Sequence, residues 1–269
     1  MKQILFLFFS FLFSFQIMHA QIHETSYFKE VIDHLSEGDL LLLDIDDTLL
    51  ITKQMLGCDE WFQYKYKQYK QEGLSPEEAL KKALNQWIAI RKLTDMELVE
   101  PQTDDHIQDL QEKGFQVMGL TTQSHMLSER TNEHLKQVSI HLQKTAPSQK
   151  DHYFVQEGRG VLYRHGILFT AGTHKGQALI DLLEILELRP KKIVFINDKE
   201  SHLKEVEVLV EQYGIPFVGL RYAYSDEKKS AFCPKIAEIQ FTHSSFDQIL
   251  SDAQARDLLE LLDSSQASL

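Results

Sequence analysis

Three carboxylates crowd into four positions of the stretch DLLLLDIDDTLL, directly after a run of leucines. Asp44, Asp46 and Asp47 repel one another unless something compensates their charge. Crowded carboxylates at the end of an apolar run indicate a bound cation, a proton that is transferred, or both. The alternative is an ordinary solvated turn, so the rest of the chain has to decide between the two.

Other residues that could take part in a reaction stand at the ends of apolar runs or at the start of a helical pattern. Thr121 ends the run VMGLT, Asp198 follows VFIN, and Lys175 stands at the start of the helical pattern HKGQALIDLLEILEL. In a parallel sheet the ligand binds beyond the carboxyl ends of the strands. We therefore expect Asp44, Thr121 and Asp198 to share one site.

The elements that must position these residues alternate along the chain. Four short apolar runs lie within residues 39–47, 114–123, 191–200 and 214–222, and helical patterns separate them. The runs are continuously apolar rather than alternating, which is typical of strands buried on both faces. Strands that alternate with helices predict an α/β fold, here a Rossmann-like parallel sheet with helices on both faces.

Residues 52–100 interrupt this alternation with two helical patterns. The second pattern opens with a capping box of Ser75 and Glu78. We expect a small helical cap inserted after the first core strand, with residues 21–51 and 101–269 forming the α/β core. The alternative is a pair of extra helices packed on the flank of the core.

A second irregular insert follows the second core strand. Within residues 145–170, the stretch GVLYRHGILFT predicts a β-hairpin that turns at His165 and Gly166.

The stretch DIDDTLL resembles the first motif of the haloacid dehalogenase-like superfamily, Asp-x-Asp-x-Thr, in a poorly characterised branch of exported bacterial phosphatase-like hydrolases. By this resemblance Asp44 is the nucleophile and Asp46 the general acid and base, while Thr48 shapes the loop. Thr121 and Lys175 match the second and third motifs. The resemblance spans roughly residues 40–220 and implies phosphatase chemistry, because relatives that cleave carbon–halogen bonds lack the second aspartate.

Asp198 matches the acidic fourth motif, and the implied cofactor is Mg²⁺ with Asp44, Asp46 and Asp198 as its ligands. A phosphate monoester repels an incoming carboxylate, and a hard divalent cation offsets that repulsion. Asp44 then attacks phosphorus to form an aspartyl-phosphate. Lys175 and Thr121 would hold the phosphoryl oxygens, and the expected substrate is a small phosphorylated molecule.

One position departs from the pattern, because Asn197 stands before Asp198 where many relatives carry a second acidic residue or glycine. The site therefore has one charge fewer, and metal affinity is expected to be weaker. This departure supports an alternative hypothesis, in which the chain is a secreted interaction protein that retains the fold but does not turn over a substrate.

Composition limits the partners. The chain has 269 residues, and its 43% hydrophobic and 25% charged residues are typical of a globular protein. The net charge of −12 argues against non-specific binding to nucleic acid or anionic lipid, since both require clustered cations. The sequence leaves the oligomeric state and the identity of the substrate open.

The first 20 residues have the layout of a secretory signal peptide: Lys2, then an uncharged apolar stretch, then Ala20. The apolar stretch is shorter than a spanning helix requires. We expect export to the periplasm or the medium, cleavage near Gln21, and no stable membrane insertion after cleavage; the alternative is an uncleaved anchor.

The chain has two cysteines, Cys58 and Cys233. Because an exported protein sits where disulfides can form, we predict one bridge between them.

Overall fold

The structure is a computed structural model that describes residues 21–245 and 248–266. The expected signal peptide lies outside the described residues. The central element is an eight-stranded sheet. The β8–β7 and β7–β6 pairs are antiparallel, and all other neighbouring strands in this sheet are parallel. In spatial order the strands are β1 (Gln21–Thr25), β10 (Phe217–Tyr222), β9 (Ile193–Asn197), β2 (Leu40–Leu43), β5 (Gln116–Thr121), β8 (Ile167–Phe169), β7 (Arg159–Arg164) and β6 (His152–Gln156).

The leucine run of β2 explains why this strand lies at the centre. Leu41 and Leu43 pack into one hydrophobic core, and Leu40 and Leu42 pack into a second core on the opposite face. The first core is covered by α3 (Thr103–Glu112) and α4 (Ser128–Gln137), and the second by α5 (Lys175–Ile185) and α6 (Glu200–Gln212). The predicted α/β sheet with helices on both faces is confirmed.

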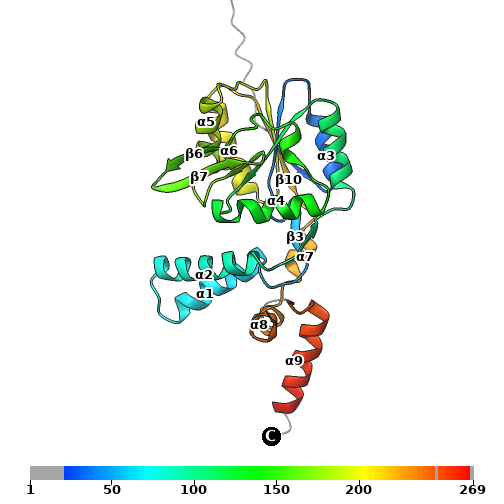
Figure 1. The fold of residues 1–269 in the computed structure, drawn as a ribbon, viewed down its shortest axis with the longest axis vertical. Coiled ribbons are helices and arrows are strands. Elements are labelled where there is room, and N and C mark those ends of the chain that lie inside the picture. Colours follow the sequence, from blue (N-terminus) through cyan, green and yellow to red (C-terminus); the bar gives the residue numbers. More distant parts are fainter. Residues whose placement is uncertain (1–20, 246–247, 267–269) are drawn as a thin grey trace, which may run out of the picture.

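The insertion after the first core strand leaves the sheet through a two-stranded antiparallel ribbon. This ribbon pairs β3 (Leu50–Thr52) with β4 (Met96–Leu98), and the helices α1 (Asp59–Gln71) and α2 (Pro76–Arg91) lie between these two strands in the sequence. The helices pack on each other and lie beyond one edge of the sheet, as Figure 1 shows. The Ser75–Glu78 capping box forms at the start of α2.

The C-terminal helices differ from our expectation that residues 101–269 belong wholly to the core. After α7 (Asp226–Ser230), the helices α8 (Pro234–His243) and α9 (Asp252–Gln266) lie on the side of α1 and α2 (Figure 1). Lys65 of α1 forms an ion pair with Glu238 of α8 at 3.2 Å, and the Leu56 N–H donates to Oε1 of Gln240 at 2.9 Å. Apolar packing explains this position, because α8 supplies Ala237 to the small hydrophobic core formed by the helical insertion.

The hairpin prediction is confirmed, and the disulfide prediction is wrong. β7 and β8 pair antiparallel around His165 and Gly166, whose φ angles of 54° and 76° fit a two-residue turn. Cys58 and Cys233 are free thiols. The Cys58 sulfur instead accepts the Trp61 N–H at 3.3 Å and caps α1, a role that the sequence spacing did not indicate.

No helix in the described part of the chain combines the length and the apolar character that crossing a membrane requires.

Candidate active site

Three neighbouring strands bring the polar strand ends together. β2 lies between β5 and β9 and is parallel to both, so Asp44, Thr121 and Asp198 follow at the same edge of the sheet. The Asp44 N–H donates to the Ile196 carbonyl at 3.1 Å, which extends the β2–β9 ladder up to the first carboxylate. This edge opens into a cavity of about 620 Å³ between the sheet and the inserted helices.

Asp44 and Lys175 form a buried ion pair at the floor of this cavity. The Lys175 Nζ lies 2.7 Å from Oδ1 of Asp44, and the lysine side chain has no exposed surface. Lys175 begins α5, so the helix start carries the cation directly to the end of the central strand. Thr48 donates to Oδ2 of Asp44 at 3.4 Å and accepts the Asp198 N–H at 3.1 Å, which joins the two strand ends.

Burial and neighbouring charges raise the pKa of two of these aspartates, Asp44 and Asp47. Burial raises the pKa of Asp44 to about 6, against the pull of Lys175, and the charges of Asp198 and Asp46 add to the rise. Burial and the same neighbours hold the pKa of Asp47 well above its usual range. Asp47 has a φ of 60° and its N–H donates to the Leu50 carbonyl, so it serves the turn into β3.

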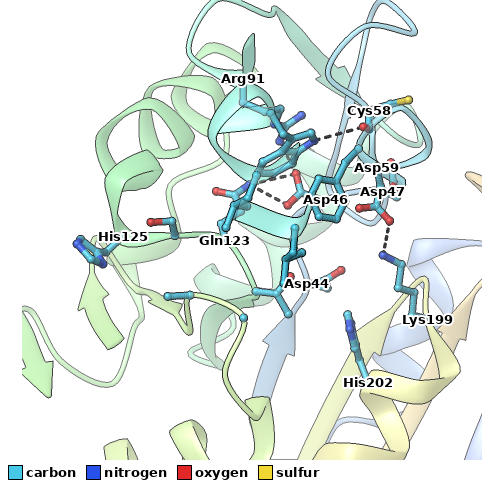
Figure 2. Close-up of a pocket in the computed structure, with 18 of the residues that line it drawn as sticks. Asp44, Asp46, Asp47, Cys58, Asp59, Arg91, Gln123, His125, Lys199 and His202 are labelled. Atoms are coloured by element: carbon cyan, nitrogen blue, oxygen red, sulfur yellow. Dashed lines mark hydrogen bonds and ion pairs between the residues drawn. The ribbon is translucent and has the colours of Figure 1, made fainter. Parts of the chain in front are cut away.

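Asp46 faces the helical insertion. Arg91, in the last turn of α2, donates to Oδ1 of Asp46, and the Gln123 amide donates to both carboxylate oxygens at 3.0 and 2.8 Å. Gln123 is itself held, because its Oε1 accepts the Thr131 hydroxyl at 2.5 Å. Figure 2 shows Arg91, Gln123 and Asp46 converging above Asp44. Donors from the cap and from the core thus fix the orientation of this carboxylate.

Asp198 has its own cation. The Lys229 Nζ lies 2.6 Å from Oδ2 of Asp198, and the aspartate is buried. The preceding Asn197 is fully buried, and its Oδ1 accepts the Lys199 N–H at 2.8 Å. That oxygen therefore shapes the turn after β9 and is not directed to a ligand.

Thr121 lies at the same edge but does not approach the carboxylates through a hydrogen bond among the described residues. Its hydroxyl accepts the Gln123 N–H at 3.1 Å, so it bends the chain and directs Gln123 at Asp46. The structure thus brings together Asp44, Lys175 and Asp198. Thr121 is connected to the carboxylates only through Gln123 among the described residues.

Several partners of the acidic residues escaped the sequence analysis. Arg91, Lys229 and Gln123 each contact a carboxylate of the motif, and Lys199 forms an ion pair with Asp59 of α1 at 2.7 Å. Gln123 and Lys199 stand within two residues of a motif position, which is a usable signal. Arg91 and Lys229 stand on helices far along the chain, and nothing in their spacing points to the strand ends.

The donor chemistry of Asp44 and Asp198 fits a hard divalent cation. Lys175 and Lys229 each contact one oxygen of these carboxylates, which leaves the other oxygen of each without a cationic partner among the described residues. No cluster of three or more acidic, histidine or cysteine side chains suited to a metal occurs in the part of the chain that the structure describes. Two carboxylates suffice for Mg²⁺, which keeps several waters and uses substrate oxygens as further ligands. The Asp46 side chain, expected as a third ligand, is instead engaged by Arg91 and Gln123.

A family model described as "Protein of unknown function (DUF2608)" matches residues 23–256. The chain belongs to this family. Among its relatives is a protein of Chlamydia pneumoniae described as "Putative outer membrane protein", which is 28% identical over 258 residues and is matched over 94% of this chain and 96% of its own length. An uncharacterized protein of Rickettsia prowazekii is 24% identical over 258 residues, with 91% of both chains covered.

Solved structures similar to this chain include a haloacid dehalogenase-like family hydrolase from Streptococcus pneumoniae. The TM-score is 0.39 at 13% identity, over 67% of this chain and 92% of that chain. A second is described as a putative beta-phosphoglucomutase from Thermotoga maritima, with a TM-score of 0.37 at 14% identity, over 72% and 99% of the two chains.

Proposed function

We propose that this protein is a Mg²⁺-dependent phosphatase of the haloacid dehalogenase type, which hydrolyses phosphomonoesters through an aspartyl-phosphate on Asp44. The observation that carries the proposal is the buried Asp44–Lys175 pair at the end of the central strand, with Asp46 two residues on and Asp198 directly after the neighbouring strand β9. A carboxylate and an ammonium group that are shielded from water interact far more strongly with a substrate phosphate than exposed groups do.

In this mechanism Asp44 attacks phosphorus, and the bond between phosphorus and the leaving oxygen breaks. Asp46 donates a proton to the leaving alcohol and afterwards takes one from the water that hydrolyses the acyl phosphate. Lys175 stabilises the charge on the phosphoryl oxygens, and Thr121 keeps Gln123 directed at Asp46. Mg²⁺, held by Asp44 and Asp198, would reduce the repulsion between the phosphate and the carboxylates.

The proposal is tested with a purified chain that begins at Gln21 and an aryl phosphate, assayed with Mg²⁺ and after chelation by EDTA. We expect phosphate release that needs the metal and is abolished in Asp44→Asn. The matched control is Asp39→Asn, because Asp39 is also buried and forms an ion pair with Lys192 at 3.1 Å, but precedes β2 at the opposite end of the strand. Equal turnover by Asp44→Asn and the parent protein would exclude the aspartyl-phosphate mechanism.

A non-catalytic interaction protein is the second candidate, and one observation favours it. Each of the three candidate carboxylates already has a cationic side chain: Lys175 for Asp44, Arg91 for Asp46 and Lys229 for Asp198. Such pairs neutralise the site without a metal or a phosphate. The same assay separates the two candidates, since a non-catalytic interaction protein would release no phosphate from any ester.

We also propose that the protein is exported and acts in the cell envelope or outside the cell. The support is the layout of residues 1–20 and the description of the Chlamydia relative as a putative outer membrane protein. An exported phosphatase meets substrates outside the cytoplasm.

A further inference from the structure

The cap side of the cavity carries an apolar stripe that ends at the acid/base residue. Leu80, Leu84, Trp87 and Arg91 of α2 all line the cavity. Their spacing of four, three and four residues places them on one face of the helix. Leu80 and Leu84 are 41% and 39% exposed, so two large apolar side chains stay uncovered where the cavity begins. Phe62 of α1 also lines this side.

The core side of the same cavity has the opposite character. It is lined by the carboxylates, by Gln123 and His125, and by Arg159, whose guanidinium donates to the Gly172 carbonyl at 3.0 Å. Figure 2 shows Gln123 and His125 on this side and Arg91 on the cap side of Asp44. The cavity is therefore amphipathic: it has a charged end at Asp44 and an apolar wall on α2, where Glu77 and Lys81 are further, charged lining residues.

The length of the apolar wall restricts the ligand. Trp87 lies seven positions after Leu80, and at 1.5 Å per residue the apolar part of the stripe extends about 10 Å along the helix axis. A single aromatic ring or a sugar is shorter than this wall and leaves part of it in contact with water. An extended chain covers it, and the cavity volume of about 620 Å³ admits one.

We propose that the substrate is the phosphomonoester of an alcohol with an extended apolar chain, whose phosphate lies at Asp44 and whose chain lies along Leu84 and Leu80. This inference rests on the proposed phosphatase function and adds the class of the leaving alcohol. Arg91 marks the point where the two halves of the ligand meet, because its guanidinium stacks on Trp87 with 5.1 Å to the ring centroid and also holds Asp46.

Binding is tested without turnover by isothermal titration of the parent protein with octylphosphonate and methylphosphonate, whose carbon–phosphorus bond is not hydrolysed. Octylphosphonate is kept below its micellar concentration. We expect it to bind at least ~10-fold more tightly than methylphosphonate, because each buried apolar group adds to the affinity. Equal affinity of the two probes, or no binding of octylphosphonate, overturns the inference.

The location of the chain is tested with Leu84→Asn and Leu80→Asn. We expect each variant to lose most of the preference for octylphosphonate, and neither should affect folding, because both leucines are exposed. The control is Leu93→Asn: Leu93 is 44% exposed, follows α2, and lies outside the cavity wall as the described residues define it. An equal loss in Leu84→Asn and Leu93→Asn contradicts the assigned wall.

Turnover separates this inference from the proposed function. Octyl phosphate and glycerol phosphate are compared as substrates, and we expect kcat/KM to favour octyl phosphate by ~10-fold or more. Hydrolysis of both esters at equal kcat/KM overturns the inference and leaves the phosphatase intact. Selective binding of octylphosphonate without hydrolysis of any ester overturns the phosphatase and supports the apolar binding site alone.

Discussion

Arg91 of the helical insertion holds the carboxylate of Asp46, a residue of the core. Arg91 is buried, and it lies in the last turn of α2, where its side chain also contacts the Met96 sulfur and the Trp87 ring. The proposed acid/base residue is thus oriented by a residue 45 positions away on a different structural unit. The position of the cap and the position of Asp46 are therefore coupled.

This coupling predicts how Arg91→Ala fails. Without the guanidinium, Asp46 is held by Gln123 alone, so protonation of the leaving group becomes less efficient. We expect kcat/KM for an alkyl phosphate to fall by roughly 10²-fold, within the usual contribution of general acid catalysis. An aryl phosphate, whose leaving group needs little protonation, should lose less. A uniform loss on both substrates indicates instead that Arg91 only supports the fold. Gln123→Leu should show the same substrate dependence.

Asp46→Asn tests the division of roles between the two aspartates. The proposed nucleophile Asp44 remains, so an aryl phosphate should still phosphorylate the protein. Hydrolysis of the acyl phosphate needs a base and should slow by roughly 10²–10⁴-fold. The phosphorylated chain should then accumulate, and rapid-quench mass spectrometry of peptides that contain Asp44 measures it. Accumulation in the parent protein but not in the variant would contradict this assignment.

The fold was predictable because the strand signal is local and strong. Four uninterrupted leucines in β2 read as a strand buried on two faces, and the structure divides their side chains between two cores. The motif spacing also predicted which strand ends meet. The edge strand β1 and the position of α8 were not predicted, because a five-residue strand and a helix with a weak apolar face reveal their partners only through tertiary packing.

The site was predictable in part, because the carboxylates and Lys175 were expected from the sequence and the other cations were not. Asp44 and Asp198 follow strands, so the parallel sheet fixes where they lie. The cationic partners of Asp46 and Asp198, which are Arg91 and Lys229, come from helices whose orientation depends on packing. A basic residue in the last turn of a helix has an ordinary role there, and no spacing rule distinguishes it from a ligand of a distant carboxylate. Non-local contacts of this kind are visible only in three dimensions.

Export predicts a shortened mature chain. If residues 1–20 are a signal peptide, the protein recovered from the periplasm or the medium begins near Gln21. Intact-mass measurement of that protein gives the answer directly. A mass that retains Met1 to Ala20 would show that the segment is not removed and would favour an uncleaved anchor.

Lys229 predicts the metal affinity of the site. Its ammonium group lies 2.6 Å from Asp198, where it competes electrostatically with a divalent cation. We expect Lys229→Ala to bind Mg²⁺ more tightly, by roughly 10-fold for a charge at this range in a partly buried site. Lys228→Ala is the control, because the neighbouring Lys228 is exposed and forms an ion pair with Glu97. Titration calorimetry measures both variants, and weaker binding in Lys229→Ala would mean that Lys229 orients Asp198 instead.

The buried imidazole of His134 in α4 should make the free energy of unfolding depend on pH. The imidazole is 3% exposed, and burial together with Arg130 and Arg91 lowers its pKa from 6.5 to about 4. The unfolded chain therefore takes up a proton near pH 6.5 that the folded protein takes up only near pH 4. Stability should consequently fall as the pH falls between these values, and His134 should contribute nothing to this slope above that window.

The measurement is the free energy of unfolding in urea at about pH 7.5 and about pH 5, for the parent protein and for His134→Gln. Between these conditions the parent should lose on the order of 2 kcal/mol through His134. The variant has no imidazole to protonate, so its stability should change with pH by that much less, whatever its absolute stability. The exposed His243 supplies the control, and His243→Gln should retain the pH dependence of the parent. Identical pH dependence in His134→Gln and the parent would show that the acid sensitivity arises elsewhere in the protein.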